Sequence, residues 1–412
     1  MSEPVAAGRP AVLVSLIAAA TLGMLASTIY VPSVPAIARG LGCTPARVQL
    51  TFVGYLSAFA IGMLVLGPLS DRYGRRRTLI AGLALSTLAS LGCAASPTIA
   101  FLIAARVAQG IGACAGMVVG RAVIRDLYDR DGAAKVISAL AIVATLVQSF
   151  APIPGGYLQE WIGWRANFVA VAVYAAFGLV LAICWVSETR VAPVSARKPA
   201  RAVASQMLPI YQQLALSRRF MGYALVATGA HAGFHIFTAG APAVLIGRYG
   251  ILPETYGFYA SLPPIGFLAG SFLSNRLNRR LGIDNLIAIG GGVLVPAGLA
   301  MVGLALLHVT GPYAVVGPMI FVCCASGLIT PNAVAGSLGV NAANVGAASG
   351  LASFLQMAGA AGATAALSLG SGRSPAWLAV VTASAGLFAI AAYGTLMQPG
   401  SRRLKADIGA PV

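Results

Sequence analysis

Long apolar runs are the feature that most constrains this chain. A helix needs about 20 mostly apolar residues to cross a bilayer, and charged residues make up only 9% of the chain, against about 25% of a typical soluble domain. We therefore predict an all-α integral membrane protein. Its twelve transmembrane helices are expected near residues 11–31, 47–69, 78–96, 99–120, 136–158, 164–186, 219–246, 255–275, 284–307, 313–337, 345–369 and 375–397.

The positive charge of the chain is concentrated in alternate loops. The formal net charge is +17, and with the N-terminus in the cytoplasm, 21 of the 27 Lys and Arg residues fall in cytoplasmic loops or tails. This is the positive-inside pattern of membrane proteins, so we predict that both termini are cytoplasmic. The basic loops also suit a bilayer surface with anionic lipids, which explains the net charge without nucleic-acid binding.

One short hydrophilic segment, Gly67–Arg77, separates two of the apolar runs. Its turn-forming and basic residues cannot lie in hydrocarbon, so we expect a short, water-exposed loop between two helices. A similar pattern, Leu273–Arg280, follows at an offset of 204 residues. Because this offset is half the chain, we predict two related six-helix bundles, residues 1–187 and 219–412, joined by a cytoplasmic linker, residues 188–218.

The Gly67–Arg77 segment resembles the G-x-L-S-D-R-x-G-R-R signature of the major facilitator superfamily, a group of secondary transporters. The resemblance implies two pseudo-symmetric bundles that transport by alternating access. It also implies that Asp71 and Arg75 hold neighbouring helices together at the cytoplasmic gate. Arg72 and Arg76 can pair with carboxylates there as well. The alternative is that these basic residues only anchor the loop.

The predicted fourth helix carries an arginine inside its apolar run. A charge there is costly, so Arg106 should face the bundle interior or a wet cavity. Arg106, Gln109 and Gly110 match the R-x-x-Q-G motif of the superfamily, which implies a role in proton transfer or substrate binding. The alternative is an arginine that extends to the outer surface. Near the inner end, Arg121 and Asp126 are candidates for a second gate pair or for a solvated helix end.

The predicted fifth helix contains Pro152, Gly155 and Gly156, a partial match to the G-P-x-x-G-G motif of antiporters. Proline removes a backbone hydrogen bond and glycine reduces bulk, so we expect a kink at a helix contact. A kink with only a structural role is the alternative. With further stretches at residues 30–35, 163–168, 331–335 and 346–350, the chain resembles the drug:proton antiporter branch, typified by bicyclomycin and chloramphenicol exporters of the bacterial inner membrane.

The chain lacks the usual proton carrier of that branch. The branch has an aspartate in its first helix where this chain has Thr28. His231 and His235 lie on one face of the predicted seventh helix and could relay a proton or bind an anion, with polar helix packing as the alternative. Asp126 beside an arginine is the other candidate for coupling. None of the acidic residues falls deep in a predicted span: they are Glu3, Asp71, Asp126, Asp129, Asp131, Glu160, Glu188, Glu254, Asp284 and Asp407.

A central cavity between the two halves is expected to hold the substrate. Because Arg106, His231 and His235 are the deepest ionisable groups, the cavity should be neutral to positive and should suit neutral or anionic cargo. Aromatic and amide side chains could line it too, with helix packing as the alternative: Tyr30, Tyr55, Phe59, Gln109, Gln148, Phe234, Phe237, Asn332 and Gln356.

The function expected from these features is proton-coupled efflux of small amphipathic compounds. Import or facilitated passage of an anionic metabolite or a metal chelate, such as a siderophore, is the alternative. The sequence has no phosphate-binding loop, no metal-ligand pattern and no catalytic motif. We therefore predict a transporter and not an enzyme, with the proton gradient as its energy source, no cofactor, and a monomer as the working unit.

Overall fold

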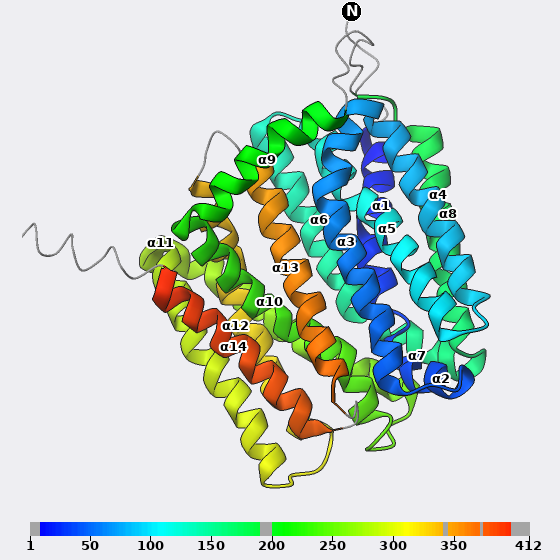
Figure 1. The fold of residues 1–412 in the computed structure, drawn as a ribbon, viewed down its shortest axis with the longest axis vertical. Helices are drawn as coiled ribbons and strands as arrows, with labels where there is room; N and C mark the ends of the chain where they lie inside the picture. Colours follow the sequence, from blue (N-terminus) through cyan, green and yellow to red (C-terminus); the bar gives the residue numbers. More distant parts are fainter. Residues whose placement is uncertain (1–8, 190–199, 341–344, 371–373, 397–412) are drawn as a thin grey trace, which may run out of the picture. The chain divides into compact units, whose positions relative to one another are not determined.

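The structure is a computed structural model that describes residues 9–189, 200–340, 345–370 and 374–396. Within these ranges all regular elements are helices (Figure 1). They group into two compact units. The described parts of residues 1–200, 238–261 and 368–373 form unit 1, and those of residues 201–237, 262–367 and 374–412 form unit 2.

Unit 1 is built around α5, which lies against α1, α3 and α4. A second group of contacts joins α8 to α1 and α4. The elements of this unit are α1 Arg9–Thr28, the 3-10 helix η1 Val31–Ser33, α2 Val34–Gly40, α3 Pro45–Tyr73, α4 Arg75–Ala94, α5 Ile99–Leu127, α6 Arg130–Phe150, α7 Pro152–Trp161 and α8 Trp164–Trp185.

Unit 2 contains the later helices, although the end of α10 and the start of α11 belong to unit 1. Its elements are α9 Ala200–Leu216, α10 Arg218–Leu245, α11 Pro253–Leu306, α12 Pro312–Gly339, α13 Val345–Ser368 and α14 Pro375–Leu396. Leu214 of α9 packs with Phe220 of α10 and Ala348 of α13. The predicted linker therefore contains a helix that is part of the core of unit 2.

Ten described segments are long and apolar enough to cross a membrane. One of them, α11, has 54 residues and would be about 80 Å long, enough to cross a bilayer of about 30 Å twice. It reverses at Gly282, whose φ is +75°. With the two arms of α11 and with α10, which has 28 residues, a helix is present at each of the twelve predicted spans.

Glycines on α5 explain why three helices can lie so close to it. A Cβ atom on Gly116 would lie 1.9 Å from the carbonyl oxygen of Ala19 in α1. A Cβ on Gly110 would lie 2.5 Å from a backbone oxygen of α3, and one on Gly112 would lie 2.6 Å from a backbone oxygen of α4. Small residues allow such backbone contacts between membrane helices, so the sequence of α5 sets the packing of unit 1.

Two sequence expectations change at the helix ends. The loop expected at Gly67–Arg77 is wrong, because α3 continues to Tyr73 and α4 begins at Arg75. Only Gly74 separates the two helices, with a φ of +101°. The helix expected over residues 136–158 is interrupted, since α6 ends at Phe150 and α7 begins at Pro152. This break is the kink that the proline predicted. The exact boundaries of the predicted halves stay a prediction.

Candidate functional site

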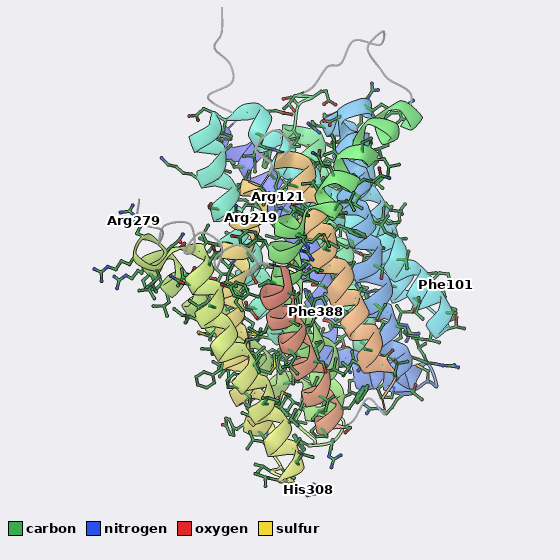
Figure 2. The ribbon with its side chains drawn as sticks, turned by 60° about the vertical axis from the view of Figure 1, so that its left-hand side comes forward. Phe101, Arg121, Arg219, Arg279, His308 and Phe388 are labelled. Atoms are coloured by element: carbon green, nitrogen blue, oxygen red, sulfur yellow. The ribbon has the colours of Figure 1, made fainter. Side chains whose placement is uncertain are left out.

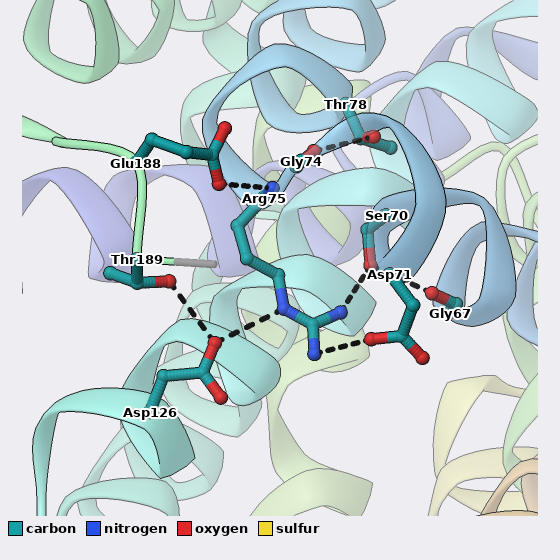
Figure 3. Close-up of polar contacts among 9 residues, drawn as sticks. All are labelled: Gly67, Ser70, Asp71, Gly74, Arg75, Thr78, Asp126, Glu188 and Thr189. Carbon is teal, nitrogen blue, oxygen red and sulfur yellow. Dashed lines mark hydrogen bonds and ion pairs between the residues drawn. The ribbon is translucent and has the colours of Figure 1, made fainter. Parts of the chain in front are cut away.

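A cluster of charged side chains surrounds Arg75 at the junction of α3 and α4 (Figure 3). The guanidinium of Arg75 lies 2.6 Å from Asp71 in α3 and 3.2 Å from Asp126 at the end of α5. It also donates to the hydroxyl of Ser70 at 2.5 Å. Arg75 itself is buried. Hydrogen bonds between ionised partners are stronger than neutral ones, so this residue ties α3, α4 and α5 together. We call Ser70, Asp71, Arg75 and Asp126 the Arg75 cluster, together with Glu188, which contacts the backbone of Arg75.

Glu188, which follows α8, completes the cluster from a distant part of the sequence. Its Oε1 accepts a hydrogen bond from the backbone N–H of Arg75 at 2.6 Å. The first N–H groups of a helix have no partner within the helix, and a carboxylate is favoured beside them. Glu188 therefore caps α4. Gly74 is needed for this contact, because a Cβ there would lie 2.3 Å from Oε2 of Glu188.

Three further hydrogen bonds hold the end of α8 and the chain after it against α4 and α5. Arg76 donates to the backbone oxygens of Val186 at 2.7 Å and Ile183 at 2.8 Å, at the end of α8. Thr189 donates to Asp126 at 3.0 Å. The segment after α8 is therefore held by both α4 and α5. Glu188 and Thr189 are the first residues of the predicted linker, so its start is fixed to unit 1.

The structure sorts the predicted gate residues into members and non-members of the Arg75 cluster. Asp71, Arg75 and Asp126 are members, and Asp126 pairs with Arg75 instead of forming a separate pair with Arg121. The guanidinium of Arg72 lies over the Tyr73 ring at 5.0 Å. Arg121 lies in α5, where its Nε is buried without a hydrogen-bond partner among the described residues. Asp126 of the second predicted pair thus joins the cluster, and Arg121 does not.

A second cluster surrounds Arg106, which is fully buried in unit 1. We call Arg106 with Gln109, Tyr30 and Tyr55 the Arg106 cluster. Its Nη1 donates to the backbone oxygen of Ala26 in α1 at 2.9 Å and to Oε1 of Gln109. The guanidinium lies over the rings of Tyr30 at 4.4 Å and Tyr55 at 4.2 Å. Cation–π contacts of this kind strengthen where water is excluded. The alternative that Arg106 extends to the surface is wrong.

The neighbours of Arg106 are themselves fixed by hydrogen bonds. Gln109 donates to Ser90 of α4 at 2.7 Å. The hydroxyl of Tyr55 donates to the backbone oxygen of Gly23 at 2.7 Å, and that of Tyr30 lies 3.2 Å from the hydroxyl of Thr51. These bonds fix the three side chains that lie against the cation. The Nε and Nη2 atoms of Arg106 are buried with no hydrogen-bond partner among the described residues.

Thr28 lies in the same unit, where the related branch has an aspartate. It is buried, and its hydroxyl donates to the backbone oxygen of Met24 at 3.0 Å. The described acidic side chains all lie at helix ends or beyond them, at Asp71, Asp126, Asp129, Glu160, Glu188, Glu254 and Asp284. Glu3, Asp407 and the side chain of Asp131 lie outside the described part. Within that part, no carboxylate sits in the middle of a membrane-spanning helix.

The antiporter-like motif forms a tight contact in unit 1. A Cβ on Gly155 would lie 1.8 Å from the backbone oxygen of Ile29, and a Cβ on Gly156 would lie 2.2 Å from that of Pro253, at the start of α11. Asn167 of α8 also donates to the backbone oxygen of Gly155, at 3.1 Å. The glycines therefore let α7 touch the end of α1 and the start of α11, and the break at Pro152 directs α7 toward them.

Of the remaining predicted cavity residues, Phe59 in α3 and Gln148 in α6 lie in unit 1, and the others lie in unit 2. The Nε2 atoms of His231 and His235 in α10 are 3.1 Å apart. Asn332 of α12 donates to Ser274 of α11 and to its own helix, both at 2.7 Å, so its amide joins two helices. Gln356 is buried in α13. A shared cavity of these residues with the Arg106 cluster stays a prediction.

Sequence reasoning missed Glu188 as a site residue. It is the acidic residue that directly follows the apolar run of α8, and only the fold brings it to the start of α4. Ser90 was also missed, because a serine in an apolar helix carries no distinctive signal. Among the described residues, no group of three or more His, Cys, Asp and Glu side chains is placed to hold a metal ion.

Comparisons with known proteins agree with this architecture. A sequence profile described as Major Facilitator Superfamily matches residues 16–364. The Uncharacterized MFS-type transporter YdgK of Bacillus subtilis (strain 168) is 31% identical over 305 residues, which cover 74% of each chain. The Bicyclomycin resistance protein homolog of Haemophilus influenzae is 27% identical over 326 residues, 77% of this chain and 80% of the other.

A solved structure has a similar fold. The crystal structure of a D-xylose-proton symporter matches with a TM-score of 0.75 and covers 93% of this chain and 97% of its own. The sequence identity is 14%, so this likeness concerns the fold alone.

Proposed function

The chain belongs to the major facilitator superfamily, and from this premise we propose that it exports small amphipathic compounds, neutral or anionic, in exchange for protons. Its predicted fold, two pseudo-symmetric six-helix bundles, is confirmed. The protein is a multi-pass membrane transporter and not an enzyme. We place it in a bacterial-type inner membrane, with both termini in the cytoplasm, working as a monomer without a cofactor.

The Arg106 cluster is the observation that carries the proposed cargo class. A fully buried guanidinium keeps two nitrogen atoms without a hydrogen-bond partner among the described residues. Buried polar groups are normally satisfied, so these donors favour a ligand that brings an acceptor oxygen. Tyr30 and Tyr55 add aromatic surface beside the cation, which suits the apolar part of an amphipathic compound. No described carboxylate is available in the spans to favour a cationic one.

The Arg75 cluster supports alternating access. It ties α3, α4, α5 and the segment after α8 together at one end of unit 1. The positive-inside pattern places that end in the cytoplasm. The cluster would then be formed while the cytoplasmic side is closed and would loosen as this side opens. Gly155 and Gly156 provide a close contact elsewhere in the same unit, which would fix α7 during the change.

The name of one relative supports drug-like cargo, since it is called a Bicyclomycin resistance protein homolog. Coupling to protons is supported by the resemblance to drug:proton antiporters. We therefore choose a panel of compounds for a transport test. It begins with bicyclomycin and chloramphenicol and includes small carboxylates to represent anionic compounds.

The test is transport by the purified protein in proteoliposomes under an imposed pH gradient. We expect uptake of at least one panel compound that depends on the gradient and collapses with an uncoupler. Transport that ignores the gradient would contradict proton coupling, and transport of none of the compounds would contradict the cargo class.

Replacement of Arg106 tests the cargo site directly. We expect Arg106→Ala to lower transport by about 100-fold, because one charged hydrogen-bonding partner contributes roughly 1.5–3 kcal/mol. Arg165→Ala is the matched control, since Arg165 is an exposed arginine of the same unit and its loss should leave transport within about twofold. Arg106→Lys keeps the charge but not the planar geometry, so it separates binding from folding. Normal transport by both Arg106 variants would show that Arg106 is not part of the cargo site.

Import of an anionic metabolite or a metal chelate is a second candidate. The same buried cation of Arg106 and the absence of a described carboxylate within the spans favour it. Whole cells discriminate the two, because an exporter lowers the intracellular amount of a labelled compound and an importer raises it.

A further inference from the structure

We propose that His231 and His235 together bind the single proton that is exchanged for cargo. This inference rests on the proposed function, because it names the group that would couple cargo to the proton gradient. It starts from the distance of 3.1 Å between the two Nε2 atoms. At that distance the atoms share one hydrogen, so one imidazole donates and the other accepts.

The shared hydrogen bond limits how much charge the pair can hold. In the neutral pair, one ring carries a proton on Nε2 and donates it to the bare Nε2 of the other ring. One added proton binds to the remaining basic nitrogen and gives a singly charged pair in which this bond persists. A second added proton would place two N–H groups against each other and two like charges in adjacent rings. The pair is therefore suited to take up and release one proton.

The position of the pair fits a proton carrier within the membrane. His231 and His235 are the 14th and 18th of the 28 residues of α10, near its middle. His235 is buried, whereas His231 is partly exposed. His231 is therefore the more accessible of the two imidazoles. The ring of Phe234 packs edge-on against His235, with centroids 5.4 Å apart.

The two histidines lie on the side of α10 that is turned away from α12 and α14. Gly229 approaches α14, where a Cβ would lie 2.8 Å from the backbone oxygen of Ala385, and Gly233 approaches Val322 of α12. Each histidine follows one of these glycines by two residues, which is about 200° around a helix. The pair is thus on the face opposite these helix contacts.

The helices packed against α10 bring few charges to the pair. α12, α13 and α14 contain no Asp, Glu, Lys or Arg, and their titratable residues are Tyr313, Cys323, Cys324 and Tyr393. α9 contains Arg201 and Tyr211, and the part of α11 in unit 2 contains Arg276, Arg279, Arg280 and Asp284.

On α10 itself the other titratable groups are Arg218, Arg219 and Tyr223. Tyr223 donates to Asp284 at 2.8 Å, and it lies eight residues before His231, about 12 Å along the helix. Imidazole ordinarily changes charge between about pH 5 and pH 8. The pair is therefore the titratable group nearest the middle of this helix.

The first experiment measures proton binding without any cargo. NMR of isotope-labelled histidine in lipid nanodiscs is followed from about pH 8 to about pH 5, the range in which imidazole titrates. The chain has three histidines, and the third, His308, is exposed at the far end of α11 (Figure 2). We expect the His231 and His235 signals to change together and to account for one proton, and His308 serves to assign the third signal. Independent titration of the two, uptake of two protons, or no change in either would overturn the proposal.

The second experiment separates the pair from the proposed function. The double variant His231→Gln/His235→Gln keeps an amide hydrogen bond but cannot titrate, and His308→Gln is the matched control. With the panel compound that the wild type transports, we expect the ratio of gradient-driven accumulation to gradient-free exchange to fall at least about tenfold in the double variant. The control should keep this ratio.

The double variant tests the histidine pair, whereas the wild type tests the proposed function. A double variant that still accumulates cargo with the gradient, beside a wild type that does so, would overturn the pair as proton carrier and leave the proposed function intact. A double variant that loses exchange as well would assign the pair to cargo binding, which also overturns the proposal. A wild type that ignores the gradient would end the proposed coupling itself, and the inference with it.

Discussion

The helix reversal at Gly74 in unit 1 and the reversal at Gly282 in unit 2 have similar sequences but different contacts. Both glycines have a positive φ, +101° and +75°. The sequence match at an offset of 204 residues places Asn278 opposite Gly74, yet the second reversal occurs at Gly282, four residues later. The basic residues that begin a helix in unit 1 therefore end one in unit 2.

This shift changes what each reversal can bind. After Gly74 comes Arg75, which pairs with Asp71 and Asp126. Two residues after Gly282 comes Asp284, an acid, which accepts a hydrogen bond from the hydroxyl of Tyr223 at 2.8 Å.

The basic residues of the second reversal lie elsewhere. Arg276 lies over the Phe272 ring at 5.2 Å, and the side chain of Arg279 extends away from the ribbon (Figure 2). Charge-assisted hydrogen bonds are roughly twice as strong as neutral ones. The comparison indicates that the ion pairs of Arg75 are the main interactions that hold the reversal in unit 1. The reversal in unit 2 is held by fewer interactions, among them the hydrogen bond from the Tyr223 hydroxyl to Asp284.

The largest expected difference in stability is between variants of Arg75 and Arg279, which correspond to each other at the offset of 204 residues. Arg75→Ala leaves Asp71 and Asp126 without their shared cation, so we expect the free energy of unfolding to fall by about 3 kcal/mol. Arg279→Ala removes an exposed side chain and should change it by less than about 0.5 kcal/mol. Thermal unfolding in detergent measures both. Equal losses would mean that the two reversals are held alike.

The two glycines should differ by a smaller amount. Alanine at either position must adopt a positive φ, at a cost of about 1–2 kcal/mol. Gly74→Ala must also displace Glu188, since the new Cβ would lie 2.3 Å from Oε2, whereas a Cβ on Gly282 meets no atom within 4 Å. We therefore expect Gly74→Ala to have the lower unfolding temperature. A lower value for Gly282→Ala would contradict the capping role of Glu188.

The smallest expected difference is between two aspartates. Asp126→Asn keeps an acceptor oxygen but loses the charge opposite Arg75, and about 1 kcal/mol of stability should go with it. Asp284→Asn keeps an acceptor for Tyr223, so its cost should stay below about 0.5 kcal/mol. Added salt should shrink the first effect and leave the second unchanged. Unfolding midpoints at low and high salt would reveal this, and a salt response of Asp284→Asn would refute it.

Much of the fold followed from the sequence because its signals are local. Apolar length and the spacing of prolines indicated the spans and the break before Pro152, and both are present. The interior position of Arg106 also followed, since a charge within an apolar run has few acceptable places. The face shared by His231 and His235 follows from helical periodicity alone.

Other features needed the tertiary structure, because they depend on contacts between distant residues. Arg75 meets Asp126 across 51 residues and Glu188 across 113. Which carboxylate reaches a given arginine depends on how closely the helices approach, and the glycines of α5 set that approach. The second reversal, at Gly282, lies between the predicted spans 255–275 and 284–307, but the offset of 204 residues alone would place it four residues earlier. Sequence similarity aligned its charges, whereas the chain turns where a glycine can take a positive φ. The sequence by itself determined where the helices are, and packing decided which of their charges meet.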